Sequence, residues 1–304
     1  MYDTLIIGSG PAGMTAGLYA ARANLKVGII EQGAPGVQMN NTSEIENYPG
    51  YDHISGPELS MKMHAPLEKF GVENIYGIVK SIEDAGDVKR VITEDATYEA
   101  KTIILATGAK NRALGVAGEE EYTSRGVSYC AVCDGAFFRN QDLLVVGGGD
   151  SAVEEAGYLT QFAKSVTIIH RRDELRAQKI LQDRAFANEK INFIWDSVVK
   201  EIKGNDIKVS GVVVENVKTG EISEHEFGGI FIYVGVDPVS KMVEGLGITD
   251  EAGWVITDDH MKTAIPGIFA IGDVRKKELR QITTAVGDGA IAGQGVYQYI
   301  ENMK

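Results

Sequence analysis

Apolar runs and glycine-rich turns follow the same order in two stretches of the chain. In each stretch an apolar run leads into a turn rich in glycine, a helix-like run follows, and a second apolar run closes the stretch. The segments are residues 4–7, 8–13, 14–23 and 26–30 in the first stretch, and residues 143–146, 147–152, 153–162 and 165–169 in the second. The pattern predicts two strand–turn–helix–strand units, each the opening of a nucleotide-binding α/β fold. The chain is therefore expected to hold two dinucleotide sites.

Further apolar runs indicate how the chain is divided. Residues 102–106 and residues 230–234 are corresponding strands of the two units. A last run at residues 263–271 leads into Gly272-Asp273, and the second unit is already complete without it. We therefore expect this last strand to return to the first unit.

The predicted fold class is α/β, with two Rossmann-like (three-layer ββα) dinucleotide-binding domains. Because the last strand returns to the first domain, the second domain is expected to be inserted in the first. The predicted boundaries place residues 1–114 and 243–304 in the first domain and residues 115–242 in the second. The chain length of 304 residues suits two domains.

The first glycine-rich turn has the spacing typical of dinucleotide binding. Gly8 permits the tight turn, Gly10 lets the backbone approach a pyrophosphate, and Gly13 lets the helix pack on the strand. The unpaired N–H groups at the start of the helix then face the pyrophosphate. Glu31 ends the second strand, where a carboxylate suits the free ribose 2′-hydroxyl of FAD or NAD.

The second unit differs at the position where the ribose is expected. Its second strand ends in His170-Arg171-Arg172, and Arg176 follows one turn later. An acid here would repel a 2′-phosphate, whereas arginine can bind it with two hydrogen bonds. The site is therefore predicted to prefer NADPH over NADH. The alternative interpretation is a solvated basic loop.

The chain has two cysteines, Cys130 and Cys133, and Asp134 follows them directly. A C-x-x-C pair closes a very small disulfide ring, and one thiol of such a pair often has a lowered pKa. Asp134 is placed to exchange a proton with a thiolate. Zinc needs about four ligands, so two cysteines alone make a poor zinc site. The alternative is a pair of buried cysteines that act as small apolar residues.

These three features together predict a type of reaction. NADPH delivers a hydride, a flavin accepts it, and a dithiol passes the electrons to an external disulfide. The net charge of −13 argues against nucleic acid as a partner. Residues 1–7 lack the basic start of a signal peptide. No apolar run reaches the roughly 20 residues that span a membrane, so we expect a cytoplasmic protein.

Several motifs resemble those of one protein family. The segment Cys130-Ala-Val-Cys133-Asp134 resembles the redox centre of bacterial-type (low-molecular-weight) thioredoxin reductases, in the class-II pyridine nucleotide-disulfide oxidoreductase family. The G-G-G-D-S-A turn and the H-R-R-D-E-L-R stretch resemble the NADPH site of that family. Gly272-Asp273, the Arg-Gln-Ile that follows it and the segment from Glu31 resemble its flavin-contacting segments. The resemblance covers essentially the whole chain.

The resemblance implies a thioredoxin-disulfide reductase that binds FAD without a covalent bond and forms a homodimer. FAD is then expected in the first domain, and NADPH and the redox disulfide in the second. The disulfide and the nicotinamide are expected to alternate at the flavin through a large domain rotation, with hinges near residues 112–118 and 240–246. Cys133 is expected nearer the flavin, with Asp134 as the acid. Which thiol attacks thioredoxin stays open.

The candidate residues follow from the motifs and the resemblance together. The predicted catalytic residues are Cys130, Cys133 and Asp134. The predicted cofactor-binding residues are Gly8, Gly10, Pro11, Ala12, Gly13, Glu31, Gln32, Gly36, Gln38, Asn47, Val79, Thr107, Gly108, Gly149, Asp150, Ser151, His170, Arg171, Arg172, Arg176, Gly272, Asp273, Arg280, Gln281 and Ile282.

The chain departs from the family pattern at one position. The family commonly has Gly-Gly-Gln before the flavin, whereas this chain has Gly36-Val37-Gln38. A β-branched side chain disfavours a positive φ, so the local geometry or the flavin affinity is expected to differ. Binding of FAD is still expected, because Gly36 and Gln38 remain.

Other functions share parts of this pattern. A ferredoxin-dependent relative or an oxidase shares the fold and the C-x-x-C pair but has less need of a 2′-phosphate clamp. A ferredoxin–NADP reductase does not need the cysteines. The reductase partner of a peroxidase usually has an additional N-terminal region, whereas the flavin motif begins here at residue 4. A redox sensor that binds both nucleotides is the non-enzymatic alternative, and it need not turn over NADPH.

Overall fold

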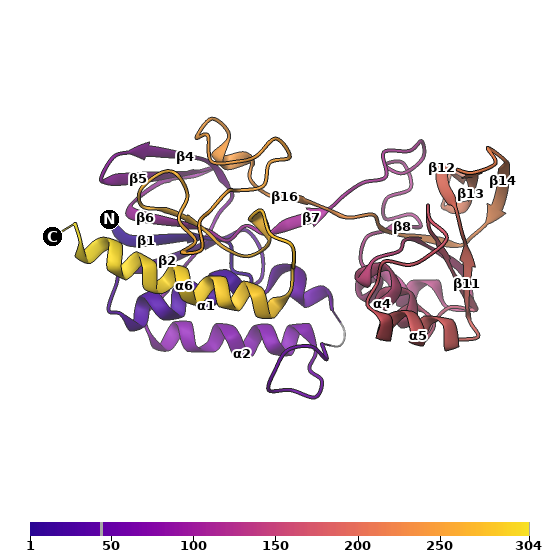
Figure 1. Cartoon of the computed structure of the whole chain (residues 1–304), viewed down its shortest axis with the longest axis horizontal. Coiled ribbons are helices and arrows are strands. Elements are labelled where there is room, and N and C mark those ends of the chain that lie inside the picture. Colours follow the sequence, from indigo (N-terminus) through magenta and orange to yellow (C-terminus); the bar gives the residue numbers. More distant parts are fainter. Residues whose placement is uncertain (43–44, 304) are drawn as a thin grey trace. The chain divides into compact units, whose positions relative to one another are not determined.

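The computed structural model describes residues 1–42 and 45–303. The chain forms two compact units (Figure 1). Unit 1 comprises Met1–Lys110 and Asp237–Lys304, and unit 2 comprises Asn111–Val236. The chain passes between the units in strands β7 (Ala109–Asn111) and β16 (Val236–Pro238), which pair with each other.

Unit 1 is built on a seven-stranded sheet in the order β3-β2-β1-β6-β5-β4, with β17 paired to β6. Strands β1, β2, β3, β6 and β17 pair in parallel, and β4, β5 and β6 form antiparallel pairs. As expected, the last strand returns to this sheet. The strands are β1 (Tyr2–Ile7), β2 (Val27–Glu31), β3 (Glu73–Tyr76), β4 (Val79–Ala85), β5 (Val88–Thr93), β6 (Thr97–Leu105) and β17 (Ile268–Ala270).

Three helices cover one face of this sheet (Figure 1). Neighbouring residues of β1 contribute to opposite faces, because side chains alternate along a strand. Ile6 packs in the helix-covered core with Phe269, whereas Leu5 and Ile7 pack in the core on the other face. The helices are α1 (Pro11–Arg22), α2 (Gly56–Lys69) and α6 (Ile282–Glu301), and the 3-10 helices are η1 (Val37–Asn41), η3 (Lys241–Val243) and η4 (Gly272–Val274).

Unit 2 has three layers. Its central sheet is wholly parallel, in the order β11-β10-β9-β15-β8, and an antiparallel sheet β12-β13-β14 forms a second layer. One face of β9 packs on the helices through Leu143 and Val145, and the other packs on the second sheet through Leu144 and Val146. The prediction of two Rossmann-like units of the ββα type is therefore confirmed.

The elements of unit 2 have the following bounds. The strands are β8 (Val127–Ser128), β9 (Asp142–Gly147), β10 (Ser165–Ile169), β11 (Ile191–Ile194), β12 (Ser197–Gly204), β13 (Val209–Asn216), β14 (Ile222–Glu226) and β15 (Gly229–Tyr233). The helices are α3 (Ala131–Asp134), α4 (Asp150–Leu159) and α5 (Lys179–Ala187), and η2 (Gly135–Phe138) is a 3-10 helix. Among the residues described here, no helix is both long enough and apolar enough to cross a membrane.

Glycines allow α6 to lie directly against α1. A Cβ atom added to Gly293 would lie 2.7 Å from the Cβ of Tyr19 and 2.8 Å from the carbonyl oxygen of Ala16. A Cβ added to Gly289 would lie 2.4 Å from the carbonyl oxygen of Ala12. These distances are too short for real atoms, so α6 can lie this close to α1 only because Gly289 and Gly293 have no side chain.

We expect Gly293→Ala and Gly287→Ala to have opposite effects on the stability of unit 1. Alanine at 293 should cost about 1–3 kcal/mol by overpacking against α1. Gly287 lies on the same helix, and within residues 1–42 and 45–303 no atom lies within 4 Å of its would-be Cβ, so alanine there should stabilise by about 1 kcal/mol. Thermal unfolding of both variants measures the difference, and equal shifts would contradict the packing argument.

Candidate dinucleotide and disulfide sites

The turn between β1 and α1 excludes side chains at two positions and leaves a third open. Gly8 has φ +105°, and a Cβ there would lie 2.4 Å from the carbonyl oxygen of Ala106. A Cβ on Gly13 would lie 2.0 Å from the carbonyl oxygen of Gly8. At Gly10, no atom of the described residues lies within 4 Å of the would-be Cβ. The turn is thus tight on its protein side and open at Gly10, as a pyrophosphate site requires.

The carboxylate of Glu31 supports this turn. Its Oε2 accepts a hydrogen bond from the backbone N–H of Ser9 at 2.8 Å, and its Oε1 accepts from the N–H groups of Gln32 at 2.8 Å and Gly33 at 3.0 Å. A carboxylate has about four lone-pair sites, so Oε2 can accept one further bond and Glu31 can hold the turn and still receive a ribose hydroxyl. The backbone of Glu31 also accepts from Gly77 at 3.1 Å, which places this end of β2 close to the start of β4 at Val79.

The segment after β17 lies against the same turn. Gly272 has φ +68°, and a Cβ there would lie 3.0 Å from the Cβ of Ala12 in the first turn of α1. The Oδ1 of Asp273 is buried and has no hydrogen-bond partner in the described structure. Burial raises the pKa of this carboxyl, while Lys277 and Arg280 oppose the rise. An unsatisfied buried oxygen beside an open glycine turn fits a polar group of a bound dinucleotide.

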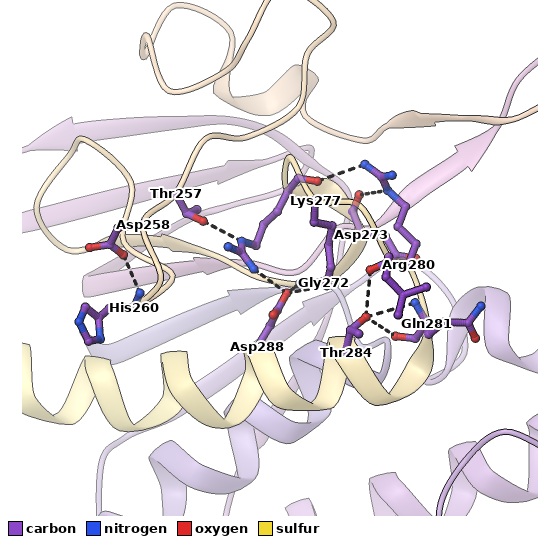
Figure 2. A network of polar contacts seen from close by, with 12 residues as sticks. Thr257, Asp258, His260, Gly272, Asp273, Lys277, Arg280, Gln281, Thr284 and Asp288 are labelled. Carbon is purple, nitrogen blue, oxygen red and sulfur yellow. Dashed lines mark hydrogen bonds and ion pairs between the residues drawn. The ribbon is translucent and has the colours of Figure 1, made fainter.

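Other predicted residues of unit 1 lie around this region. Arg280 donates to the backbone oxygens of Asp273 at 3.4 Å and Arg275 at 3.3 Å (Figure 2). Its guanidinium also stacks over the ring of Trp254 at 3.8 Å from the centroid. The sequence alone gives Trp254 only a structural role, because no motif links it to Arg280.

The amide side chains predicted for this site already have protein partners. Asn47 donates to the side-chain oxygen of Gln281 at 3.0 Å, next to Ile282 at the start of α6. Gln38 donates to the carbonyl oxygen of Ala109. Thr107 precedes Gly108, which has φ +69°, and its hydroxyl donates to the carbonyl oxygen of Val239 at 2.5 Å.

The departure at Val37 has a visible consequence. Gly36 has φ +96° and Val37 has φ +46°, at the start of η1. A β-branched residue with positive φ is strained, by about 1–3 kcal/mol. The N–H of Gly36 donates to the carbonyl oxygen of Ser9 at 2.8 Å, which ties this strained segment to the glycine-rich turn.

The turn between β9 and α4 repeats the arrangement in unit 2. Gly147 has φ +152°, and a Cβ there would lie 2.3 Å from the carbonyl oxygen of Tyr233. At Gly149, before Asp150-Ser151, the part of the chain that the structure describes has no atom within 4 Å of the would-be Cβ. The second turn is thus open at the position equivalent to Gly10.

Two contacts attach the basic loop to this turn. The backbone N–H of Arg176 donates to the carbonyl oxygen of Gly148 at 2.7 Å. The carboxylate of Asp150 accepts two bonds from Gln178, from the backbone at 2.7 Å and from the side chain at 2.8 Å. Asp150 was predicted to contact a cofactor; in this structure its carboxylate binds the loop through Gln178.

The four basic residues of this loop separate into two groups. His170 is 5% exposed, and its ring nitrogen Nε2 has no hydrogen-bond partner in the described structure. Its ring lies directly beneath Gly148, where a Cβ would lie 2.5 Å from Nδ1. Burial, followed by the nearby arginines, lowers the pKa of His170, which favours the neutral ring. The other three, Arg171, Arg172 and Arg176, are exposed, and none of them makes an ion pair with the residues that the structure describes.

The two cysteines form a disulfide across the short helix α3. Cys133 is exposed and Cys130 is half-buried. The backbone N–H of Cys133 donates to the sulfur of Cys130 at 3.1 Å. This contact favours a thiolate at Cys130 once the disulfide is reduced.

Asp134 is linked to Cys130 through a residue that the sequence did not single out. The hydroxyl of Ser128 donates to Oδ2 of Asp134 at 2.7 Å and accepts from the backbone N–H of Cys130 at 3.0 Å. Ser128 is buried at the end of β8. Only the pairing of β8 with the central sheet reveals this role, because the sequence around Ser128 has no strand pattern.

Two titratable groups lie behind the disulfide helix. The hydroxyl oxygen of Tyr233 accepts from the backbone N–H of Ala131 at 2.9 Å, and burial raises the pKa of this phenol. Glu155 on α4 is close enough to Tyr233 for its charge to raise that pKa further. Burial, and then the charge of Glu154, raises the pKa of Glu155 to about 8. The sequence contains one indication that Tyr233 lies near a site: it lies at the end of a predicted strand, and ligands usually bind at the carboxyl ends of parallel strands.

The pKa of Glu155 predicts that the stability of unit 2 falls with rising pH. A carboxyl with a raised pKa stabilises the fold fully below its ordinary pKa of 4.5, and this contribution is lost as the pH rises to about 8. A tenfold change in proton affinity corresponds to about 1.4 kcal/mol. The Tm of Glu155→Gln minus the Tm of the unsubstituted protein should therefore increase from pH 5 to pH 9. The exposed Glu189→Gln is the control, and Tm curves that stay parallel would refute the assignment.

Comparison with known proteins gives consistent matches over the chain. Residues 2–289 match the family described as pyridine nucleotide-disulphide oxidoreductase. The thioredoxin reductase of Listeria monocytogenes is 57% identical over 304 residues, covering 100% of this chain and 95% of the relative.

Solved structures of thioredoxin reductases also match this chain. Thioredoxin reductase from Lactococcus lactis in the FR conformation is 68% identical with a TM-score of 0.99, covering 99% of this chain and 100% of that one. The enzyme from Streptococcus pyogenes is 80% identical with a TM-score of 0.67, covering 99% of each chain. These matches confirm the resemblance and the oxidoreductase class inferred from the motifs.

Proposed function

Because the chain belongs to the pyridine nucleotide-disulphide oxidoreductase family, we propose that it is an NADPH-dependent thioredoxin-disulfide reductase that uses FAD. The observation that carries the proposal is a partly exposed disulfide in the same unit as an open dinucleotide turn, next to which three arginines have no ion pair within the described residues. A ferredoxin–NADP reductase does not need the disulfide, and a redox sensor is distinguished by turnover, because it need not turn over NADPH.

Unit 1 is the proposed site of FAD. The open position at Gly10 and the N-terminus of α1 suit the pyrophosphate, and Glu31 suits the adenosine ribose. The unsatisfied Oδ1 of Asp273 is available to a further hydroxyl. A flavin held there supplies an acceptor for the hydride of NADPH and a donor of two electrons to a disulfide.

Unit 2 is the proposed site of NADPH. Gly149 and the N-terminus of α4 suit its pyrophosphate. The guanidinium groups of Arg171, Arg172 and Arg176 suit the 2′-phosphate, because arginine binds phosphate with two parallel hydrogen bonds. The neutral ring of His170 supports the turn from below, and it is the three arginines that supply the charge.

The disulfide provides a route for two electrons to reach a protein substrate. Two electrons and two protons convert Cys130–Cys133 into a dithiol as the S–S bond breaks. The thiolate of one cysteine then attacks the substrate disulfide and forms a mixed disulfide, releasing one substrate sulfur. The second cysteine attacks the mixed disulfide, which restores Cys130–Cys133 and releases the substrate as a dithiol. Asp134, held by Ser128, is the proposed proton donor and acceptor in these steps.

The surface next to the disulfide suits a protein substrate. Phe137 follows Cys133 by four positions in η2, and its side chain is 78% exposed. An exposed aromatic ring beside a redox centre is a suitable anchor for a protein partner.

We also propose that the enzyme works as a homodimer in the cytoplasm. Light scattering at micromolar concentration tests the dimer, and a monomer would contradict it.

The central prediction concerns turnover. Purified protein with NADPH, thioredoxin and a chromogenic disulfide should show steady thioredoxin-dependent reduction, far weaker with NADH. Cys133→Ser should abolish this turnover, because the dithiol can no longer form. Absorbance measures both. If NADPH bleaches the flavin but thioredoxin gives no turnover, the partner is a different disulfide. If NADPH does not bleach the flavin, the assignment of the arginine cluster is wrong.

Gln178→Ala should weaken discrimination between NADPH and NADH. The change removes the side-chain bond to Asp150 that helps to hold Arg176 near the glycine-rich turn. We expect the KM for NADPH to rise about tenfold, equivalent to about 1.4 kcal/mol, and the KM for NADH to change little. The exposed Gln161→Ala in the same unit is the control. Equal increases in both KM values would show that Gln178 does not act through the 2′-phosphate.

A further inference from the structure

A single buried carboxylate on α6 binds three donors from one loop. Asp288 is 8% exposed, and its Oδ2 accepts from the backbone N–H of Gly272 at 2.9 Å. The same oxygen lies 3.0 Å from the guanidinium of Arg275 and 2.9 Å from the ammonium of Lys277 (Figure 2). The three residues follow β17 directly, so Asp288 fixes the segment that leads out of the sheet.

The charges around Asp288 make this contact hard to replace. The side chains of Arg275 and Lys277 are each 11% exposed, so both cations are largely removed from water. Arg275 also donates to the hydroxyl of Thr257 at 2.7 Å, which is a neutral partner. A buried cation that loses its anion is strongly unfavourable, so removal of the Asp288 charge should displace the loop.

The segment held by Asp288 faces the proposed flavin site. A side chain at position 272 would be strained, because Gly272 has φ +68° and a Cβ would lie only 3.0 Å from the Cβ of Ala12 at the start of α1. The next residue is Asp273, whose Oδ1 is buried and unpaired within the described structure. The peptide that joins them thus sets the direction of a buried carboxyl oxygen that has no hydrogen-bond partner among the described residues.

We propose that Asp288 is a positioning residue for FAD, which it orients through Gly272 and Asp273. This inference rests on the proposed binding of FAD in unit 1. Asp288 holds the Gly272 N–H from the helix side and joins α6 to the loop through Arg275 and Lys277. Asp273 is thereby kept beside the first turn of α1, in position before the flavin binds.

Two substitutions separate the parts of this role. Asp288→Asn keeps the size and an acceptor for Gly272 but leaves the two cations without a charged partner. Asp288→Leu removes both functions. Asp259→Asn is the matched control, because Asp259 is exposed and lies outside the loop. The full-length apoproteins are titrated with FAD, and the quenching of flavin fluorescence gives the Kd on the folded, monodisperse fraction. Visible circular dichroism of the bound flavin reports its surroundings.

We expect the Kd for FAD to rise about fivefold or more in Asp288→Asn and further in Asp288→Leu, with an altered visible circular dichroism spectrum. Asp259→Asn should match the unsubstituted protein. If the Asp288→Asn apoprotein has a lower Tm but an unchanged Kd and spectrum, Asp288 is only structural and the inference is wrong. If the unsubstituted protein binds no FAD, the proposed function fails as well, so the two failures are distinguishable.

Discussion

The structure depends on the close approach of main chains where a strand, a glycine-rich turn and a helix meet. In unit 1 the position of a Cβ on Gly13 is occupied by the carbonyl oxygen of Gly8, and in unit 2 that of a Cβ on Gly147 is occupied by the carbonyl oxygen of Tyr233. Each helix can therefore begin directly at the end of its strand. Its first N–H groups point to the open positions at Gly10 and Gly149, where a bound anion is favoured.

Around this shared constraint the two units differ in charge. Near its glycine-rich turn, unit 1 presents the carboxylates of Glu31 and Asp273, whereas unit 2 presents arginines that make no ion pair with any residue the structure describes. The chain as a whole has a net charge of −13, so the basic loop is a local exception to an acidic protein. A negatively charged nucleotide is thus attracted to one end of unit 2 and not to the surface in general.

The sequence predicted the features that depend on short segments. The glycine spacing, the apolar strands and the C-x-x-C pair each lie within about thirty residues, as the nucleotide-binding signature does. Features that join distant segments were missed. Asp288 looks like an ordinary polar position of α6 until the loop after β17 is placed beside it, and Tyr233 meets Ala131 only through the register of the central sheet. His170 looked equivalent to its arginine neighbours, but it lies buried beneath Gly148.

The division of the chain has a consequence for the order of folding during synthesis. Unit 2, Asn111–Val236, is a continuous segment and can fold as soon as it leaves the ribosome. Unit 1 is divided by unit 2, so β17 and α6 are synthesised only after unit 2, whereas β1 to β6 are synthesised before it. The earlier segment of unit 1 therefore has part of its apolar sheet uncovered while unit 2 folds. Chaperones that protect exposed apolar surface should bind this protein chiefly through residues 1–110 until α6 has been synthesised.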